Sequence, residues 1–205
     1  MIIHNCDQGS AEWYALRAGM PTASDFSKLI TSAGETSKSL AGYAITLAAE
    51  KYAGKPVDAW QGNGHTDRGK ALEPAARAAY ALIHDHEVTQ AGFVTDDLGR
   101  YGCSPDGLVG DDGIAEFKCL KAENHIKAIM YYRKYNVCPP DYVQQTQGQL
   151  LVCKRQWSDL VFYHPDLPKL VIRQERDGHF IEALEHHIDM VIVERDRILS
   201  EIEAV

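Results

Sequence analysis

Two short segments in the middle of the chain place two carboxylates and a lysine at a spacing that can do chemistry. Residues 104–107 read Ser-Pro-Asp-Gly, and residues 116–118 read Glu-Phe-Lys. Carboxylate oxygens are hard ligands of the kind that Mg²⁺ prefers, and a lysine ammonium can hold or activate an attacking water. Asp106, Glu116 and Lys118 are therefore candidates for a metal-dependent centre that hydrolyses phosphodiesters.

The residues between these segments predict a β-hairpin that brings the three side chains together. The sequence Gly-Asp-Asp-Gly at 110–113 is typical of a tight turn. Successive strand residues alternate faces, so Glu116 and Lys118 share one face and Phe117 points to the other. If the last three turn residues form the loop, Asp106 lies opposite Lys118. A solvated, charged hairpin tip would have the same composition, so the rest of the chain must decide.

Composition sets bounds on the fold and on the class of protein. The chain has 205 residues, 45% of them hydrophobic and 24% charged, which predicts one soluble globular domain over residues 1–205. No apolar run approaches a membrane span, and no basic segment precedes an apolar one at the N-terminus, so we expect a cytoplasmic protein. The odd number of cysteines, without a C-x-x-C pair, indicates reduced thiols and disfavours an iron–sulfur cluster: Cys6, Cys103, Cys119, Cys138 and Cys153.

The net charge of −8 disfavours indiscriminate coating of nucleic acid. Net charge is an average over the whole molecule, however. An enzyme with an acidic metal site can still gather its basic groups on one concave surface or channel.

Hydrophobic periodicity predicts an α/β fold with a central mixed β-sheet flanked by helices. Helices are expected at residues 12–16, from 22 to about 30, and at 39–53, 66–84, 122–135, 141–153 and from 180 onward. Strands are expected at residues 88–95, 100–119, 157–163 and 170–174, with a loop at 60–64. Pro74 predicts a kink or a late start in its helix. The apolar stripe of the last helix indicates core packing.

Two further sets of side chains could complete the centre. Glu73, beside a helix-distorting proline, could add a ligand for a second metal, or could be a solvated helix residue. Gln145 and Gln147 belong to a glutamine-rich helix whose amides could orient a water or a phosphate oxygen, or could form a polar outer face. None of the nine histidines has partners at convincing metal-ligand spacing.

A terminal phosphate could bind near the helix expected at residue 22. Thr22 is a candidate helix cap, and Arg17 and Ser24 flank it. Free backbone N–H groups, a hydroxyl and a guanidinium together suit a phosphate. Ordinary capping beside a surface arginine is the alternative.

Taken together, these motifs resemble the phage lambda exonuclease family, viral-type recombination nucleases within the PD-(D/E)xK superfamily. The matching blocks lie in family order between about residues 12 and 155: residues 13–19 with 22–24, residues 69–73 with 76–77, residues 103–108, residues 116–119, and Tyr142-x-x-Gln145-x-Gln147. The last fifty residues match only loosely. The hairpin motif is common to many nucleases, whereas the R-x-G-x-x-T-A-S block and the glutamine helix are more specific.

The resemblance implies a restriction-endonuclease-like core and an Mg²⁺-dependent exonuclease, with Mn²⁺ as an alternative ion. Such enzymes degrade one strand of duplex DNA from a 5′-phosphorylated end and leave a 3′ single strand for recombination. The resemblance also implies a ring-shaped homotrimer, a single-strand annealing protein as partner, and a phage or prophage gene expressed in a bacterial cytoplasm.

By the same resemblance, each candidate residue has a role. Two metal ions are implied. Asp106, Glu116 and the Phe117 carbonyl bind metal, Glu73 supports the second ion, Lys118 positions or activates the water, and Gln145 helps to orient it. Arg17, Thr22 and Ser24 match the 5′-phosphate pocket.

Two other functions stay open at this point. One is a different nuclease of the superfamily, either an endonuclease or a Cas4-like enzyme, although Cas4-like enzymes carry four cluster cysteines that this chain lacks. The other is a non-catalytic DNA-binding scaffold for recombination, which the complete set of Asp106, Glu116 and Lys118 disfavours.

Overall fold

The computed structural model describes residues 1–57, 64–84 and 87–204, with only the backbone of residues 64–67. The helices are α1 (Ala11–Arg17), the 3₁₀ helix η1 (Ala23–Lys28), α2 (Leu40–Ala53), α3 (Gly64–His84), α4 (Ala122–Tyr135), α5 (Pro140–Cys153) and α6 (Gly178–Glu203). The strands are β1 (Ile2–His4), β2 (Val88–Thr89), β3 (Phe93–Thr95), β4 (Gly102–Cys103), β5 (Gly107–Val109), β6 (Gly113–Lys118), β7 (Trp157–Phe162) and β8 (Leu170–Glu175).

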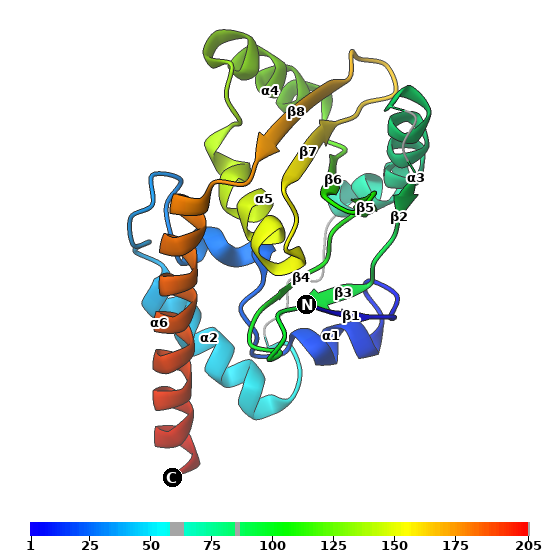
Figure 1. Ribbon diagram of the computed structural model, residues 1–205. Coiled ribbons are helices and arrows are strands. Elements are labelled where there is room, and N and C mark those ends of the chain that lie inside the picture. The colour runs from blue at the N-terminus through cyan, green and yellow to red at the C-terminus, as the bar shows by residue number, and fades with distance from the viewer. Residues whose placement is uncertain (58–63, 85–86, 205) are drawn as a thin grey trace.

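The main sheet is mixed and lies between helices, which confirms the predicted fold class (Figure 1). Its strand order is β2-β5-β6-β7-β8, and only the β6–β7 pair is parallel. One face of the sheet packs against α4 and α5, whereas α3 covers the opposite face through Ala76 and Tyr80, which contact Phe117 and Val161. Strand alternation therefore directs Glu116 and Lys118 toward α5.

A second, three-stranded sheet was not predicted. It has the order β1-β3-β4, and both pairs are antiparallel. The single strand expected at residues 88–95 is wrong, because β2 and β3 belong to different sheets. The chain between them crosses the N-terminal segment so closely that a β carbon on Gly92 would collide with the carbonyl of Cys6.

The predicted helices are confirmed except for the one expected from residue 22, which is the short 3₁₀ helix η1. The stripe of α6 buries Ile181, Leu184, Ile188 and Val191, and α6 packs on α2 (Figure 1). A late start caused by Pro74 is wrong, because α3 begins at Gly64 and carries the proline in its interior. The loop expected at 60–64 lies outside the described residues, apart from the glycine that begins α3.

The predicted hairpin around residues 110–113 forms, but its predicted register is wrong by two residues. Gly107 pairs with Ala115 and Val109 with Gly113, so the loop is residues 110–112. Two features cause the shift: Gly110 has a left-handed φ of 50°, and a β carbon on Gly113 would collide with the Trp157 ring that lies on the strand. A shift of two residues preserves the face of every side chain.

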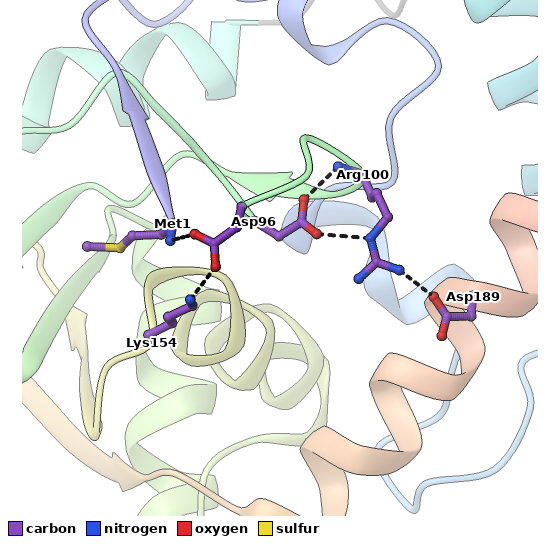
Figure 2. Close-up of polar contacts among 6 residues, drawn as sticks. Met1, Asp96, Arg100, Lys154 and Asp189 are labelled. Atoms are coloured by element: carbon purple, nitrogen blue, oxygen red, sulfur yellow. Dashed lines mark hydrogen bonds and ion pairs between the residues drawn. The ribbon is translucent and has the colours of Figure 1, made fainter.

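Ion pairs link the turn after β3 to the N-terminal amine, to the end of α5 and to the middle of α6 (Figure 2). Asp97 contacts the N-terminal amine of Met1 and the Lys154 ammonium. Arg100 pairs with both Asp96 and Asp189 of α6. The pairs made by Asp97 and Asp189 are exposed and contribute little to stability, whereas Asp96 is buried beneath Arg100.

No helix in the described part of the chain combines the length and the apolar character needed to cross a membrane.

Candidate active site

The centre of the site is the buried carboxylate of Glu116, of which 3% is exposed. Lys118 Nζ donates to Glu116 Oε1 over 2.9 Å, and Gln145 Nε2 donates to the same oxygen over 2.6 Å. Gln149 Nε2 donates to Oε2 over 2.7 Å. Lys118 Nζ also donates to Gln145 Oε1 over 2.8 Å, which closes a ring of hydrogen bonds between β6 and α5. A buried carboxylate needs such donors, because an unpaired charge in the interior is costly.

Asp106 lies at the start of β5, beside this ring. Its Oδ2 accepts a hydrogen bond of 2.7 Å from the Phe117 N–H. Burial and the charges of Glu116 and Glu73 raise the pKa of Asp106 well above its ordinary value, against the opposing effect of that hydrogen bond. Burial alone would lower the pKa of Lys118, but the carboxylates of Glu116 and Asp106 outweigh it and raise that pKa.

Glu73 reaches the same region from α3. Its Oε1 accepts a hydrogen bond of 2.5 Å from Arg77 Nη2. Burial raises the pKa of Glu73; the Arg77 guanidinium opposes this shift and the charge of Glu116 adds to it. Glu73 also lines a cleft of about 910 Å³ formed by the N-terminal segment, α3 and residues 90–92.

The oxygen atoms of Asp106, Glu116 and the Phe117 carbonyl would suit a hard divalent ion that keeps some of its water ligands. No group of three or more His, Cys, Asp or Glu side chains among residues 1–57, 64–84 and 87–204 could hold a metal ion. The N–H and C=O groups of one extended residue point to the same strand edge, so the Phe117 carbonyl faces the side of Asp106. Two carboxylates and one carbonyl leave room for water and phosphate oxygens, which is the usual pattern for Mg²⁺.

A second polar cluster lies at the end of α1. Arg17 Nη2 donates to Thr22 Oγ1 over 3.1 Å and to Ser24 Oγ over 3.2 Å. The Arg17 guanidinium lies 4.2 Å from the centroid of the Trp13 ring, and Trp13 Nε1 donates to Ser104 Oγ over 2.7 Å. Ser104 precedes Asp106 by two residues, so this cluster is coupled directly to the catalytic hairpin.

The expected helix cap at Thr22 is wrong. The hydroxyl of Thr22 makes no capping hydrogen bond, and the following element is the short 3₁₀ helix η1 rather than an α-helix. Arg17 uses that hydroxyl instead. Burial lowers the pKa of Arg17, although its ordinary value is so high that it stays charged. A desolvated guanidinium beside two hydroxyls is suited to bind an anion.

Sequence reasoning misassigned one glutamine of α5 and missed another. Gln147 points away from the site: it donates to the carbonyl of Glu175 and accepts from the N–H of Asp177, so it holds β8 and α6. Gln149 contacts Glu116 instead. The available signal was the i, i+4 spacing between Gln145 and Gln149, which places both on one helix face.

The fold and this constellation together define a nuclease core of the PD-(D/E)xK type. Residues 12–156, more than half of the chain, match the model of the YqaJ-like viral recombinase domain. The chain belongs to this family, which confirms the expected relationship to the lambda exonuclease-like nucleases and places it among DNA exonucleases.

Solved structures agree with this assignment. An alkaline exonuclease (LHK-Exo) from Laribacter hongkongensis is 32% identical, with a TM-score of 0.83 over 95% of this chain and 97% of that chain. Its complex with dAMP gives the same values. A phage-related exonuclease from Haemophilus somnus is 16% identical and shares the fold, with a TM-score of 0.72 over 91% of this chain and 98% of that chain. No curated protein matches the chain.

The raised pKa of Asp106 predicts how stability depends on pH in the absence of metal. Between the ordinary pKa of an aspartate and the raised one, the folded state binds more protons than the unfolded state, so the free energy of unfolding falls as pH rises. Asp106→Asn keeps an acceptor for the Phe117 N–H and cannot ionise. With a chelator present, we expect this variant to be more stable than the wild type at pH 8, because it removes the buried charge that faces Glu116 and Glu73.

Urea denaturation at pH 8 and at pH 4 measures this effect. The difference between the two proteins should shrink at pH 4, where the wild-type carboxyl is protonated. A variant less stable than the wild type at pH 8 would contradict the repulsion between the carboxylates.

Substitutions of Gln149 and Gln147, on the same helix, separate an effect on catalysis from an effect on stability. Gln149→Met keeps most of the volume but removes a donor to Glu116, so we expect kcat for DNA hydrolysis to fall about tenfold or more. Gln147→Met removes two hydrogen bonds to backbone, so we expect a loss of about 1–3 kcal/mol in the free energy of unfolding with kcat retained. Activity that follows stability alone in both variants would exclude a role of Gln149 in the site.

Proposed function

We propose that this protein is an Mg²⁺-dependent exonuclease that removes nucleotides from the 5′ end of one strand of duplex DNA. The observation that carries the proposal is the direct coupling of two sites, one on the β5–β6 hairpin and the other at the end of α1. Asp106, Glu116 and Lys118 form a candidate hydrolytic centre, and Arg17 with its hydroxyl partners forms a candidate phosphate pocket coupled to it through Trp13 and Ser104.

The metal site would consist of Asp106, Glu116 and the Phe117 carbonyl. Bound Mg²⁺ would act as a Lewis acid on the phosphate oxygens and favour ionisation of the attacking water. A second ion would need Glu73, whose carboxylate is engaged by Arg77. Mn²⁺, which accepts the same oxygen ligands, is an alternative.

Lys118 is suited to position groups by donating hydrogen bonds. Its raised pKa keeps it protonated in the metal-free site. Two of its three N–H donors reach Glu116 and Gln145, which leaves one for a water or a phosphate oxygen. The side-chain oxygen of Gln145 accepts from the ammonium and its side-chain nitrogen donates to Glu116, so Gln145 fixes the ammonium in this orientation.

The phosphate pocket explains repeated removal from one end. When the water oxygen bonds to phosphorus and the P–O3′ bond breaks, the phosphate stays on the shortened strand. Each cycle then regenerates a 5′-phosphate, which is the ligand that suits Arg17, Thr22 and Ser24.

The remaining 3′ strand would pass to a single-strand annealing protein for recombination. The gene would belong to a phage or prophage, and the enzyme would act in the bacterial cytoplasm. We propose a ring-shaped homotrimer with a basic channel, because a chain with a net charge of −8 has little electrostatic means to stay on DNA.

Replacement of a proposed metal-binding carboxylate should abolish hydrolysis. Asp106→Ala or Glu116→Ala should lower the rate more than about a hundredfold, because each removes a carboxylate that the metal needs. Lys118→Ala should lose rate with little change in DNA affinity, and EDTA should stop the wild type. The assay is release of nucleotides from 5′-phosphorylated duplex with added Mg²⁺.

Closed circular duplex is the control that separates the alternatives. An endonuclease would cut it, and a non-catalytic scaffold would release nothing from any DNA. Near-normal turnover by Asp106→Ala would refute the assigned centre.

Arg17→Ala should erase the preference for a 5′-phosphate over a 5′-hydroxyl. The contact is charge-assisted, so the selectivity lost should be about 1.5–3 kcal/mol. Hydroxyl-ended DNA should be cut about as before. Rates of digestion of the two substrates measure this, with Arg197→Ala on the exposed side of α6 as the matched control. Equal slowing on both ends would instead assign Arg17 a structural role.

The proposed ring makes digestion resistant to salt after binding. We expect light scattering to give a trimer and digestion under substrate excess to be processive. Moderate salt should slow capture of DNA more than later cycles, because screening weakens attraction but does not open a ring. A monomer with distributive digestion would remove the trimer and leave the catalytic assignment unchanged.

A further inference from the structure

The segment that follows the catalytic lysine has a charge opposite to that of the whole chain. Residues 118–137 contain five Lys or Arg and one acidic residue, whereas the chain has 21 Lys and Arg against 29 Asp and Glu. Three tyrosines lie among these cations, at 131, 132 and 135. Cations interleaved with aromatic rings are typical of a surface that binds single-stranded nucleic acid.

Two connected hollows lie along this segment, and we name them together the α4–α5 groove. The larger, of about 410 Å³, is lined by Lys127 and Tyr131 of α4, by Tyr142 of α5, and by the intervening prolines. The smaller, of about 210 Å³, is lined by Arg68 and Lys121. The two hollows are continuous, because Leu120 and Asn124 line both.

The groove begins at the catalytic centre. The ring centroid of Tyr142 lies 5.5 Å from Lys118 Nζ, and Lys121 follows that lysine by three residues. At the other end, Tyr131 and Tyr135 have ring centroids 4.7 Å apart, with Lys134 Nζ 4.8 Å from the Tyr135 ring. A strand leaving the centre would therefore meet cations and rings along the length of α4.

The cleft beside Glu73 has the opposite character. Asp7 and Glu12 line it as well, and Lys70 is the one cation among its described lining residues. Phosphodiesters are repelled by such a lining. Of the two hollows, the α4–α5 groove is the one with electrostatic complementarity to DNA.

We propose that the α4–α5 groove binds the strand being degraded, on the 3′ side of the scissile phosphate. This inference rests on the proposed function. A base stacks on Tyr131, and Lys121 and Lys127 contact phosphates. The Arg17 cluster holds the 5′ end at α1, and α4 lies at the opposite end of the molecule, so the remaining strand extends from α1 toward α4 (Figure 1).

The local contacts permit this binding. Lys127 is strongly exposed and pairs with Glu123 only across one turn of the helix. Exposed pairs of this kind are weak and exchange readily for a phosphate. Lys121 is exposed, and Tyr131 is partly exposed at the wall of the hollow.

Binding to the inactive Asp106→Asn protein tests the proposal. The probe is a fluorescent, 5′-phosphorylated duplex, measured by anisotropy between 50 and 200 mM salt. Tyr131→Ala should weaken binding about tenfold, whereas Tyr131→Phe should restore it, because stacking needs the ring and not the hydroxyl. Replacing Lys121 and Lys127 by alanine should reduce the salt slope on this duplex by about 0.9 for each lysine.

Controls of the same size and charge come from the other end of the molecule. Tyr52, of which 64% is exposed, and Lys55 follow the buried part of α2. Tyr52→Ala and Lys55→Ala should leave DNA binding within twofold of the parent. Binding of dAMP, a probe of the 5′ nucleotide site, should be unchanged in every groove variant.

An abasic nucleotide locates the stacked base. Placed at one internal position near the 5′ end, it should remove the effect of Tyr131→Ala; placed at the terminal nucleotide, it should not. Unchanged affinity and salt slope in the groove variants would overturn the proposal. So would a loss of oligomeric state in light scattering with DNA affinity retained, since α4 would then be a subunit interface.

The two levels of the proposal fail separately. If the wild type releases no nucleotides although the groove variants lose affinity, the exonuclease function fails and the strand-binding groove remains. If the groove variants bind and digest DNA like the wild type, only the groove is refuted.

Discussion

The structure depends on a burial that is unfavourable in free energy: the carboxylate of Glu116 lies buried in the middle of the main sheet. A charge in that position must be surrounded by donors, or it would be expelled or neutralised. Lys118 from the same strand and two glutamines from α5 provide them. The hydrogen-bond ring therefore couples folding to function, because the groups that make burial tolerable also fix the orientation of the ammonium and of a metal ligand.

Other features of the fold follow from the need to hold α5 against the hairpin. Gly148 lets the helix approach η1, since a β carbon there would collide with the Phe26 ring. Arg155, just beyond α5, donates to the carbonyls of Val109, Gly110 and Gly113 and so holds the hairpin loop. The hairpin is thus fixed at its loop by an arginine and at its open end by the ring around Glu116.

The sequence predicted the site where its geometry follows from alternation or helical spacing. Glu116 and Lys118 share a face in any strand, and this holds whatever the register. The register itself depends on how the Trp157 ring packs on Gly113, a contact from a strand more than forty residues away that local pattern does not encode. The same limit applies to Gln147, whose partners lie in β8 and at the start of α6. The small sheet was missed because β1 has only three residues and its partner strands are distant in sequence.

The acidic balance of the chain also has a physical consequence for its chemistry. The carboxylates proposed to bind a metal would also repel phosphates, so a long acidic surface around the centre would exclude a DNA substrate. The cations are therefore separated in space: Arg17 lies at the end of α1, whereas Arg68, Lys121 and Lys127 line the α4–α5 groove. In the proposed arrangement, the Arg17 cluster and the α4–α5 groove would hold one strand on both sides of the scissile bond. Net charge alone would have argued against DNA as the substrate, whereas the distribution of charge favours it.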